Sequence, residues 1–174
     1  AVGPIAYIVR ARFVGLRDLG PALPPQSAFQ IIQGLETVSL RMEKHCSNAA
    51  KVAEYLSNHN KVSRVIYAGL DEGEAGERAN KYLKGGHGAL CGIELKGGKA
   101  SGEKFINNLN MFYHVANIGD ARSLAIHPAS TTHSQLSDED MESAGVNPSY
   151  VRLSIGIEHI DDIIEDLKNA LDAA

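Results

Sequence analysis

A single arginine interrupts an otherwise apolar stretch, Val151-Arg152-Leu153-Ser154-Ile155. Arginine is almost never fully buried unless it is paired, and its planar guanidinium suits a carboxylate held by two parallel hydrogen bonds. The pattern alone favours a plainer interpretation, in which Arg152 pairs with Glu158 or Asp120 or lies on an edge strand with its head in water. A carboxylate-binding site is the functional alternative.

A second polar stretch lies between residues 117 and 136. The chain leaves an apolar strand at Asn117, turns at Gly119-Asp120 and continues through a loop rich in hydroxyl groups. Polar groups crowded between buried strands are costly unless they pair with one another or with a ligand. Asn117 is therefore either a turn former, which its residue type alone favours, or a hydrogen-bond donor to an anionic ligand.

Two other kinds of chemistry are weaker interpretations of the same loop. His114, His127 and His133 match no known spacing of metal ligands, and His127 more simply anchors the loop. A Ser-His-Asp triad could be assembled from Ser123, His127 and Asp120, but the Gly-x-Ser-x-Gly nucleophile elbow is absent. The hydroxyl groups of the loop are expected to satisfy its own backbone: Ser130, Thr131, Thr132 and Ser134.

The bulk composition limits the class of protein. The formal net charge is -4 over 174 residues, which argues against a nucleic-acid partner. No apolar run approaches the roughly 20 residues that span a bilayer, so no membrane partner is expected. Cys46 and Cys91 fit neither a disulfide framework nor a zinc site, and we expect free thiols in a reducing cytoplasm.

The order of hydrophobic patterns predicts an α/β chain. Residues 1–59 read as helical, and residues 60–174 alternate between strands and helices, which favours a mainly antiparallel sheet with helices on one face. The predicted helices are Ile5–Leu19, one from Pro25, Leu40–Ser57 with Ser39 as its cap, Glu77–Leu83, Lys99–Leu109, one beginning at Ser137 with a capping box, and His159–Leu171. The predicted strands are Val62–Ala68, Ala89–Leu95, Phe112–Ile118, Ser123–Ile126 and Tyr150–Ile155.

The apolar faces of residues 5–57 are wide, and the rest of the chain is too small to cover them. The chain also begins without methionine and enters an apolar segment at once. We therefore expect a piece of a longer protein.

Three stretches together resemble one family. Gln33–His45, Asn117–Leu136 and Val151–Glu158 are similar, in the same order, to the C-terminal part of the Cys/Met-metabolism pyridoxal-phosphate enzymes. The resemblance covers essentially the whole chain and implies the C-terminal small domain of an aspartate-aminotransferase-like, fold type I enzyme. Relatives acting on cystathionine or methionine tend to carry Ser at the Asn117 position and Glu at the Arg122 position. Asn117 and Arg122 here therefore favour the O-acetylhomoserine sulfhydrylase branch.

The resemblance also implies roles for particular residues. Residues 1–59 would be bridging helices that belong to a larger cofactor domain, and residues 60–174 would close the active-site cleft. Arg152 would grip the α-carboxylate of the substrate. Asn117 would lie beside that carboxylate and the pyridoxal phosphate, while Ser123 and Thr132 would line the entrance. Members are typically homotetramers.

The chain departs from the family pattern because it lacks the Schiff-base lysine, the glycine-rich phosphate cup and the aspartate that faces the pyridine nitrogen. The Schiff-base lysine of the family follows Ser-x-Thr, and none of the nine lysines here follows a threonine. The implied reaction of the parent enzyme replaces the acetate of O-acetyl-L-homoserine by sulfide to give L-homocysteine, in methionine biosynthesis. Methanethiol as nucleophile, a methionine γ-lyase, a cystathionine γ-synthase or lyase, and a non-catalytic amino-acid-binding module remain alternatives. The 174-residue chain alone is predicted to be inactive.

Overall fold

The structure, a computed structural model, describes residues 3–174, with the exception of the side chains of Asp138 and Glu142. The chain divides into two compact units, Ala1–Ser39 and Leu40–Ala174. The first unit contains helical segments only, and the second contains the sheet with the helices that pack on it. Each unit is described by itself below.

The first unit consists of short helical segments with exposed surfaces. A single turn over Gly3–Ile5 leads into α1 (Ala6–Arg10) and a wider, π-helical stretch over Ala11–Asp18, so the predicted helix over residues 5–19 is confirmed with mixed geometry. Helix α2 (Pro25–Glu36) begins with a proline at its first position, where the missing N–H has no helical partner to lose.

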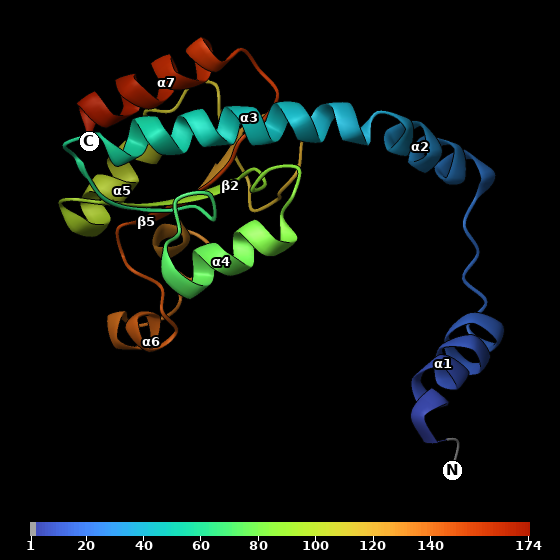
Figure 1. Cartoon of the computed structure of the whole chain (residues 1–174). Coiled ribbons are helices and arrows are strands. Elements are labelled where there is room, and N and C mark those ends of the chain that lie inside the picture. The colour runs from blue at the N-terminus through green and yellow to red at the C-terminus, as the bar shows by residue number, and fades with distance from the viewer. Residues whose placement is uncertain (1–2) are drawn as a thin grey trace. The chain divides into compact units, whose positions relative to one another are not determined.

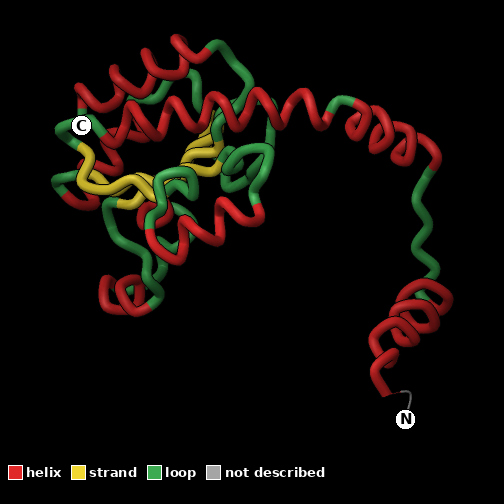
Figure 2. The backbone as a smooth tube through the Cα atoms, in the orientation of Figure 1, coloured by secondary structure: helices red, strands yellow, loops and turns green. Residues whose placement is uncertain are grey.

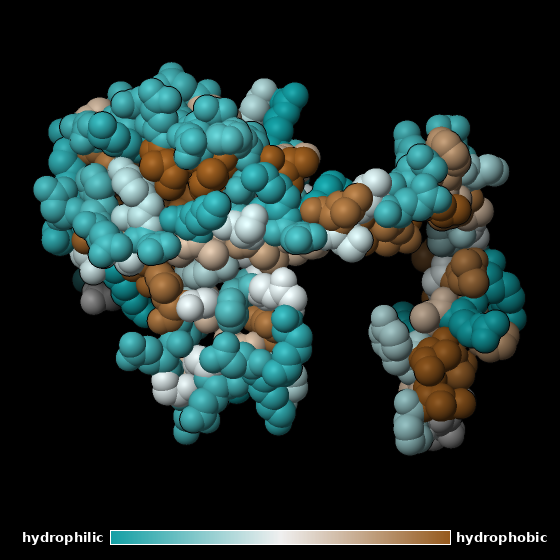
Figure 3. Space-filling view, turned by 45° about the horizontal axis from the view of Figure 1, so that its top comes forward, coloured by the Kyte–Doolittle hydropathy of each residue, from teal (hydrophilic) through white to brown (hydrophobic). Residues whose placement is uncertain are grey.

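None of these described segments buries a residue, and large apolar side chains are at least half exposed along them: Ile5, Tyr7, Ile8, Phe13, Leu16, Leu19, Leu23, Phe29, Ile31, Ile32 and Leu35. Figure 3 shows these hydrophobic side chains at the surface. The predicted wide apolar faces are therefore present.

Helix α3 (Val38–Ser57) follows α2 after the single residue Thr37. It begins two residues before the predicted start at Leu40, so Ser39 lies inside the helix and does not cap it. One face is buried at three- and four-residue steps: His45, Asn48, Ala49, Val52, Ala53 and Leu56. This face packs in the core of the sheet, and the two compact units meet between Ser39 and Leu40.

The second unit carries one five-stranded sheet, in the order β1-β2-β5-β4-β3 (Figures 1 and 2). All neighbouring strands are antiparallel except β3 and β4. This confirms the mainly antiparallel sheet and the predicted order of elements. Their bounds are β1 (Val62–Ile66), α4 (Gly73–Tyr82), β2 (Leu90–Leu95), α5 (Gly98–Asn107), β3 (Tyr113–His114), β4 (Leu124–Ile126), a 3₁₀ turn (Pro128–Ser130), α6 (Asp138–Ser143), β5 (Tyr150–Ser154) and α7 (Ile160–Ala173).

The two faces of the sheet differ because strand residues alternate between them. The buried face packs against α3, α5 and α7, as Figure 1 shows for α3 and α7, and its core includes Ile93, Val151, Leu153, Phe105 and Leu167. The alternate residues face the opposite side. A bulge between Val62 and Arg64 in β1 keeps Val62 in the core while Arg64 joins that opposite face.

Three local predictions have different outcomes. At the start of α6, the Ser137 hydroxyl accepts a hydrogen bond from the Asp140 backbone N–H (3.1 Å), so Ser137 caps the helix as predicted. The Asp140 carboxylate accepts from the same hydroxyl (2.7 Å), whereas the reciprocal bond of a capping box goes to the backbone N–H of the cap residue. The predicted strand over residues 112–118 is too long, because β3 ends at His114 and the chain then leaves the sheet. Helix α4 also begins earlier than predicted, at Gly73 instead of Glu77.

Candidate functional site

Arg152 lies on β5, the central strand, and faces the side of the sheet opposite to α3 and α7. Its neighbours in register are Gly92 on β2 and Ile126 on β4. Arg152 as a residue is half-buried, and its Nη2 donates hydrogen bonds, on the exposed side, to the carbonyl oxygens of Ala116 (2.8 Å) and Asn117 (3.2 Å). The edge-strand interpretation of Arg152 is therefore wrong.

The two acids that the sequence offered as internal partners of Arg152 are engaged elsewhere. Glu158 accepts hydrogen bonds from the backbone N–H and hydroxyl of Ser123, and Asp120 accepts one from the backbone N–H of Arg122. Among the described side chains, no carboxylate forms an ion pair with Arg152. A half-buried arginine whose described partners are only two carbonyl oxygens keeps donors available for an anion, because guanidinium has five N–H groups.

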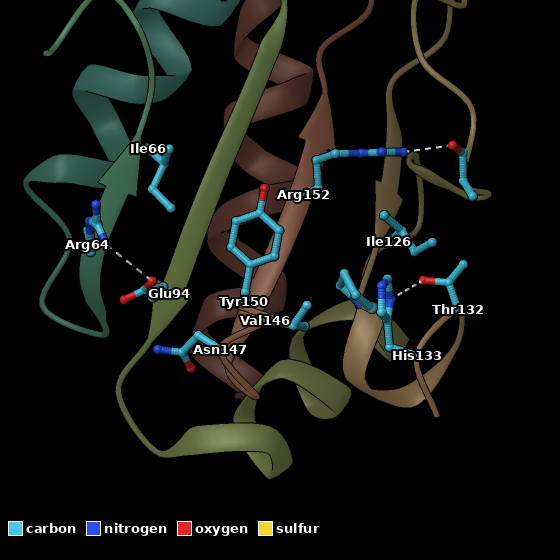
Figure 4. Close-up of a pocket in the computed structure, with 13 residues that line it drawn as sticks. Arg64, Ile66, Glu94, Ile126, Thr132, His133, Val146, Asn147, Tyr150 and Arg152 are labelled. Carbon is cyan, nitrogen blue, oxygen red and sulfur yellow. Dashed lines mark hydrogen bonds and ion pairs between the residues drawn. The ribbon is translucent and has the colours of Figure 1, made fainter. Parts of the chain in front are cut away.

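A hollow of about 640 Å³, here called the sheet hollow, opens beside Arg152 (Figure 4). Side chains from four strands and from the loops beyond β4 and α6 line it: Arg64, Ile66, Glu94, Ile126, Thr132, His133, Val146, Tyr150 and Arg152. Arg64 and Glu94 pair at 3.7 Å on one side of it. The sheet hollow is therefore mainly apolar in its floor and charged at its sides.

Tyr150 occupies the middle of this hollow, between Glu94 and Ile126 in Figure 4. Its ring lies against Gly92, where a Cβ atom would come within 2.5 Å of the ring. Burial raises the pKa of the Tyr150 phenol, and the nearby Arg152 cation only partly opposes this shift. The phenol is therefore neutral at physiological pH and can donate a hydrogen bond.

Thr132 and His133 lie on the loop after β4 and line the sheet hollow on the side of Ile126 (Figure 4). The Thr132 hydroxyl and His133 Nδ1 lie 2.9 Å apart. Thr132, predicted to line the entrance, thus shares this hollow with Arg152.

A second hollow of about 560 Å³, here called the loop hollow, lies on the other side of Arg152. Only the backbone turn Ala116–Asp120 and Arg152 line it. Asn117 is exposed there, and its own carbonyl oxygen holds the guanidinium. The structure therefore brings the backbone of Asn117 to Arg152, through a carbonyl oxygen that every residue type carries.

Ser123 has a different place from the one expected. It is 0% exposed and lines neither of the two hollows. Its hydroxyl donates to Glu158 (2.9 Å) and accepts from the Gly156 backbone N–H (2.9 Å). The hydroxyl is thus used inside the fold and not at the entrance.

The histidines of this region are likewise explained by local contacts. His127 is buried, with Nδ1 2.8 Å from the Ser130 hydroxyl and Nε2 2.8 Å from the Pro148 carbonyl oxygen, so it anchors the loop as predicted. Ser123, His127 and Asp120 therefore have separate partners and form no triad. Among the described residues, no group of three or more His, Cys, Asp or Glu side chains has the arrangement of a metal site.

Cys46 and Cys91 are free thiols, half-buried and buried respectively, as the sequence predicted. Over residues 3–174, no helix combines the length and the apolar character needed to cross a membrane.

Sequence reasoning missed several residues of the sheet hollow, among them Arg64, Glu94 and Tyr150. A signal for Tyr150 was available, because it lies two residues before Arg152 on the same strand and must share its face. Arg64 shares a face with Ile66 for the same reason. Gly92 carried no comparable signal, since the need for a small residue depends on the strand that lies next to it.

The residues of this chain do not suffice to hold pyridoxal phosphate covalently. Neither the sheet hollow nor the loop hollow has a lysine in its lining. A Schiff base to the cofactor needs a lysine amine at the reacting carbon. The arrangement around Arg152 instead fits a carboxylate, which bidentate guanidinium recognition favours.

Comparisons with known proteins place the sequence in one family. The family model described as Cys/Met metabolism PLP-dependent enzyme matches residues 6–172. The chain is 55% identical over 168 residues to the O-acetyl-L-homoserine sulfhydrylase of Leptospira meyeri, covering 96% of this chain and 38% of that protein. It is 45% identical over 162 residues to an L-methionine gamma-lyase of Fusobacterium nucleatum subsp. polymorphum, covering 92% of this chain and 41% of that protein.

A solved structure has the same fold. The putative O-acetylhomoserine (thiol)-lyase from Campylobacter jejuni, which contains N'-pyridoxyl-lysine-5'-monophosphate, superposes with a TM-score of 0.85 at 42% identity, covering 99% of this chain and 41% of that one. The chain thus spans about two fifths of the length of these relatives. Because the family model covers nearly the whole chain and the fold agrees, the chain belongs to the Cys/Met metabolism PLP-dependent enzymes.

Proposed function

We propose that this chain is the C-terminal, carboxylate-binding part of an O-acetyl-L-homoserine sulfhydrylase, which replaces the acetate of O-acetyl-L-homoserine by sulfide and releases L-homocysteine. The observation that supports it is the half-buried residue Arg152, which borders two hollows and whose described hydrogen-bond partners are the carbonyl oxygens of Ala116 and Asn117. The 55% identity to a sulfhydrylase supports this branch of the family.

The geometry around Arg152 suits the acidic end of an amino acid. The two carbonyl oxygens fix Nη2, and this fixes the plane of the guanidinium, so the remaining N–H groups keep a set direction. A carboxylate would accept hydrogen bonds from Nε or Nη1, which the two carbonyl oxygens do not use, and the exposed amide of Asn117 would add a further donor in the loop hollow. Thr132 would contact the substrate from the wall of the sheet hollow.

The electron-withdrawing chemistry would come from another part of the parent enzyme. Pyridoxal phosphate, when bound there, stabilises the carbanions that γ-replacement requires. Residues 1–59, with the exposed apolar side chains of α1 and α2, would bridge to the larger cofactor domain within a homotetramer in the cytoplasm. The 174-residue chain alone would be inactive, and a stable Schiff-base absorbance band after addition of pyridoxal phosphate would contradict this.

The carboxylate assignment is tested in the full-length enzyme that contains this chain, with O-acetyl-L-homoserine and its α-carboxamide as paired substrates. Arg152→Gln should lower kcat/KM for the acid by about 100- to 1,000-fold, because a desolvated carboxylate loses its partner. Turnover of the carboxamide should change little. Arg152→Lys should recover only part of the loss, because an ammonium group lacks the planar fork.

Arg64→Gln is the matched control, because Arg64 lines the same hollow but already pairs with Glu94. It should leave the preference for the acid over the carboxamide unchanged. The assignment is wrong if Arg64→Gln, and not Arg152→Gln, abolishes that preference.

A γ-lyase is the second candidate, supported by the 45% identity to an L-methionine gamma-lyase. Product analysis of the full-length enzyme separates the two. Homocysteine and acetate from O-acetyl-L-homoserine and sulfide support the sulfhydrylase, whereas 2-oxobutanoate and ammonia from methionine support the lyase. Methanethiol, offered in place of sulfide, tests which thiol is the nucleophile. Cysteine, offered in place of sulfide, tests whether the enzyme is a cystathionine synthase. If no amino acid is turned over while one still binds, the protein is a non-catalytic binding module.

A further inference from the structure

The loop 116–123 is attached to the turn 154–158, which connects β5 to α7, by a set of hydrogen bonds here called the loop–turn network. At one end, the backbone N–H of Gly119 donates to the Ser154 hydroxyl (3.1 Å). In the middle, the backbone N–H of Ile157 donates to the Ala121 carbonyl oxygen (2.9 Å). The other end is held by side chains. The loop that carries Asn117 is therefore fixed to the strand that carries Arg152.

Glu158 forms the side-chain end of this network with Ser123. One carboxylate oxygen accepts from the Ser123 backbone N–H (2.6 Å), and the other accepts from the Ser123 hydroxyl (2.9 Å). The same hydroxyl accepts from the Gly156 backbone N–H. Two of these bonds involve an ionised acceptor, which makes them stronger than neutral ones.

Gly156 is the residue that allows this close approach. A Cβ atom there would overlap the Glu158 carboxylate and lie 2.5 Å from both the Ala121 carbonyl oxygen and the Ser123 nitrogen. The backbone of the turn is held from the other side by Asn48 of α3, whose amide donates to the carbonyl oxygens of Gly156 (3.0 Å) and Glu158 (2.9 Å). The turn is thus a rigid base for the Glu158 side chain.

The network reaches the carboxylate-binding site through the loop. Residues 116–122 are exposed and follow Val115, whose backbone N–H still donates to the Ala125 carbonyl oxygen of β4 (3.2 Å), so side-chain burial contributes little to the position of residues 116–122. The carbonyl oxygens that orient Arg152 belong to Ala116 and Asn117, at the start of this exposed segment. We propose that Glu158, acting with Ser123, is a positioning residue that fixes these carbonyl oxygens and so orients the Arg152 guanidinium toward the substrate carboxylate. This inference rests on the proposed function of Arg152.

The test uses the full-length enzyme and the ratio of kcat/KM for O-acetyl-L-homoserine to kcat/KM for its α-carboxamide. Glu158→Ala should lower kcat/KM for the acid about 10- to 100-fold, because small displacements of a binding group have effects of this size. The value for the carboxamide should fall by less than about 3-fold, so the ratio falls. A purely structural defect would lower both values equally and leave the ratio unchanged, which would overturn the inference.

Conservative variants show whether the hydrogen bonds of Glu158 or its negative charge are needed. Glu158→Gln should restore most of the ratio, because its amide oxygen accepts from the Ser123 N–H and its NH₂ donates to the hydroxyl. Ser123→Ala keeps the backbone contact to Glu158 and should lower the ratio less than Glu158→Ala does. Asp162→Ala removes an exposed carboxylate in the first turn of α7 and should leave the ratio unchanged. If Glu158→Ala fails to fold, Ser123→Ala with an unchanged ratio overturns the inference instead.

A double-mutant cycle links the effect to Arg152. In the Arg152→Gln enzyme, adding Glu158→Ala should change kcat/KM for the acid by less than about 3-fold, because the group that Glu158 positions is gone. An additive effect would overturn the inference. If Arg152→Gln alone leaves the ratio unchanged, the proposed function fails. If Arg152→Gln lowers the ratio and Glu158→Ala does not, only the positioning role fails.

Hydrogen–deuterium exchange gives a readout that does not depend on turnover. Glu158→Ala should speed exchange of the backbone amides between residues 116 and 123, while those of β2 stay protected. Unchanged exchange in the loop would overturn the inference.

Discussion

The imidazole Nδ1 of His45 lies 2.6 Å from the backbone carbonyl oxygen of Ile155 and joins helix α3 to the end of strand β5. His45 is 2% exposed, and Nδ1 carries the hydrogen in this contact because a carbonyl oxygen can only accept. Nε2 has no hydrogen-bond partner among the described residues. Three residues further along α3, Asn48 holds the following turn, so one face of this helix supports the base of the site.

Replacing His45 by phenylalanine should destabilise the chain. The Ile155 carbonyl oxygen would lose its buried donor, and an unsatisfied buried acceptor costs about 1–3 kcal/mol. The free energy of unfolding from urea titration of the purified chain measures this loss. His114→Phe, at an exposed position on β3, should change it by less than about 0.5 kcal/mol. Equal effects of the two substitutions would contradict the role of the His45 contact.

The stability of the chain should decline in alkali through Cys91. Burial raises the pKa of the Cys91 thiol from 9.0 to about 12 in the folded protein. The contribution of the neutral Cys91 thiol to the free energy of unfolding is therefore fully present below pH 9. It is lost as the pH rises from 9 toward 12, by up to about 1.4 kcal/mol per pH unit, because the unfolded chain then binds fewer protons. Urea titrations at pH 8 and pH 10.5 should show a smaller decline for Cys91→Ala than for the unchanged chain. Parallel declines would disprove the contribution of Cys91.

Removal of residues 1–37 should leave the sheet unit intact. No residue in the helical segments between Gly3 and Glu36 is buried, so their loss removes little packing and the melting temperature should stay within a few degrees. Self-association should fall, because exposed apolar side chains such as Phe29 and Ile32 are removed. Scanning calorimetry and sedimentation velocity measure the two effects. A shorter deletion, of residues 1–19, keeps α2 and should reduce self-association less. Loss of cooperative unfolding would show that the first unit supports the second.

The sequence predicted the order of elements well wherever the hydrophobic period was strong. Helices α3 and α7 bury residues at three- and four-residue steps, and these steps were visible in the sequence. The prediction was poorest for β3. Val115 and Ile118 suggested that the strand continues, but both are exposed, because the backbone turns away from the sheet where it supplies carbonyl oxygens to Arg152.

The site was predictable in its residues and less so in its contacts. Arg152 was conspicuous, as a charged residue within an apolar stretch. Its described partners are backbone carbonyl oxygens, which every residue type carries, so no pattern of side chains could indicate them. Glu158, which the sequence offered as one alternative partner of Arg152, instead bonds Ser123, because the turn after β5 directs its side chain toward β4.

The place of Arg152 in the middle strand has a consequence for motion. β5 is hydrogen-bonded on both sides, to β2 and to β4, so it cannot slide or swing without breaking two ladders. The strand cannot therefore carry the guanidinium as a flap or a lid would. The guanidinium moves relative to the sheet only through the torsions of the Arg152 side chain, and otherwise it moves together with the sheet.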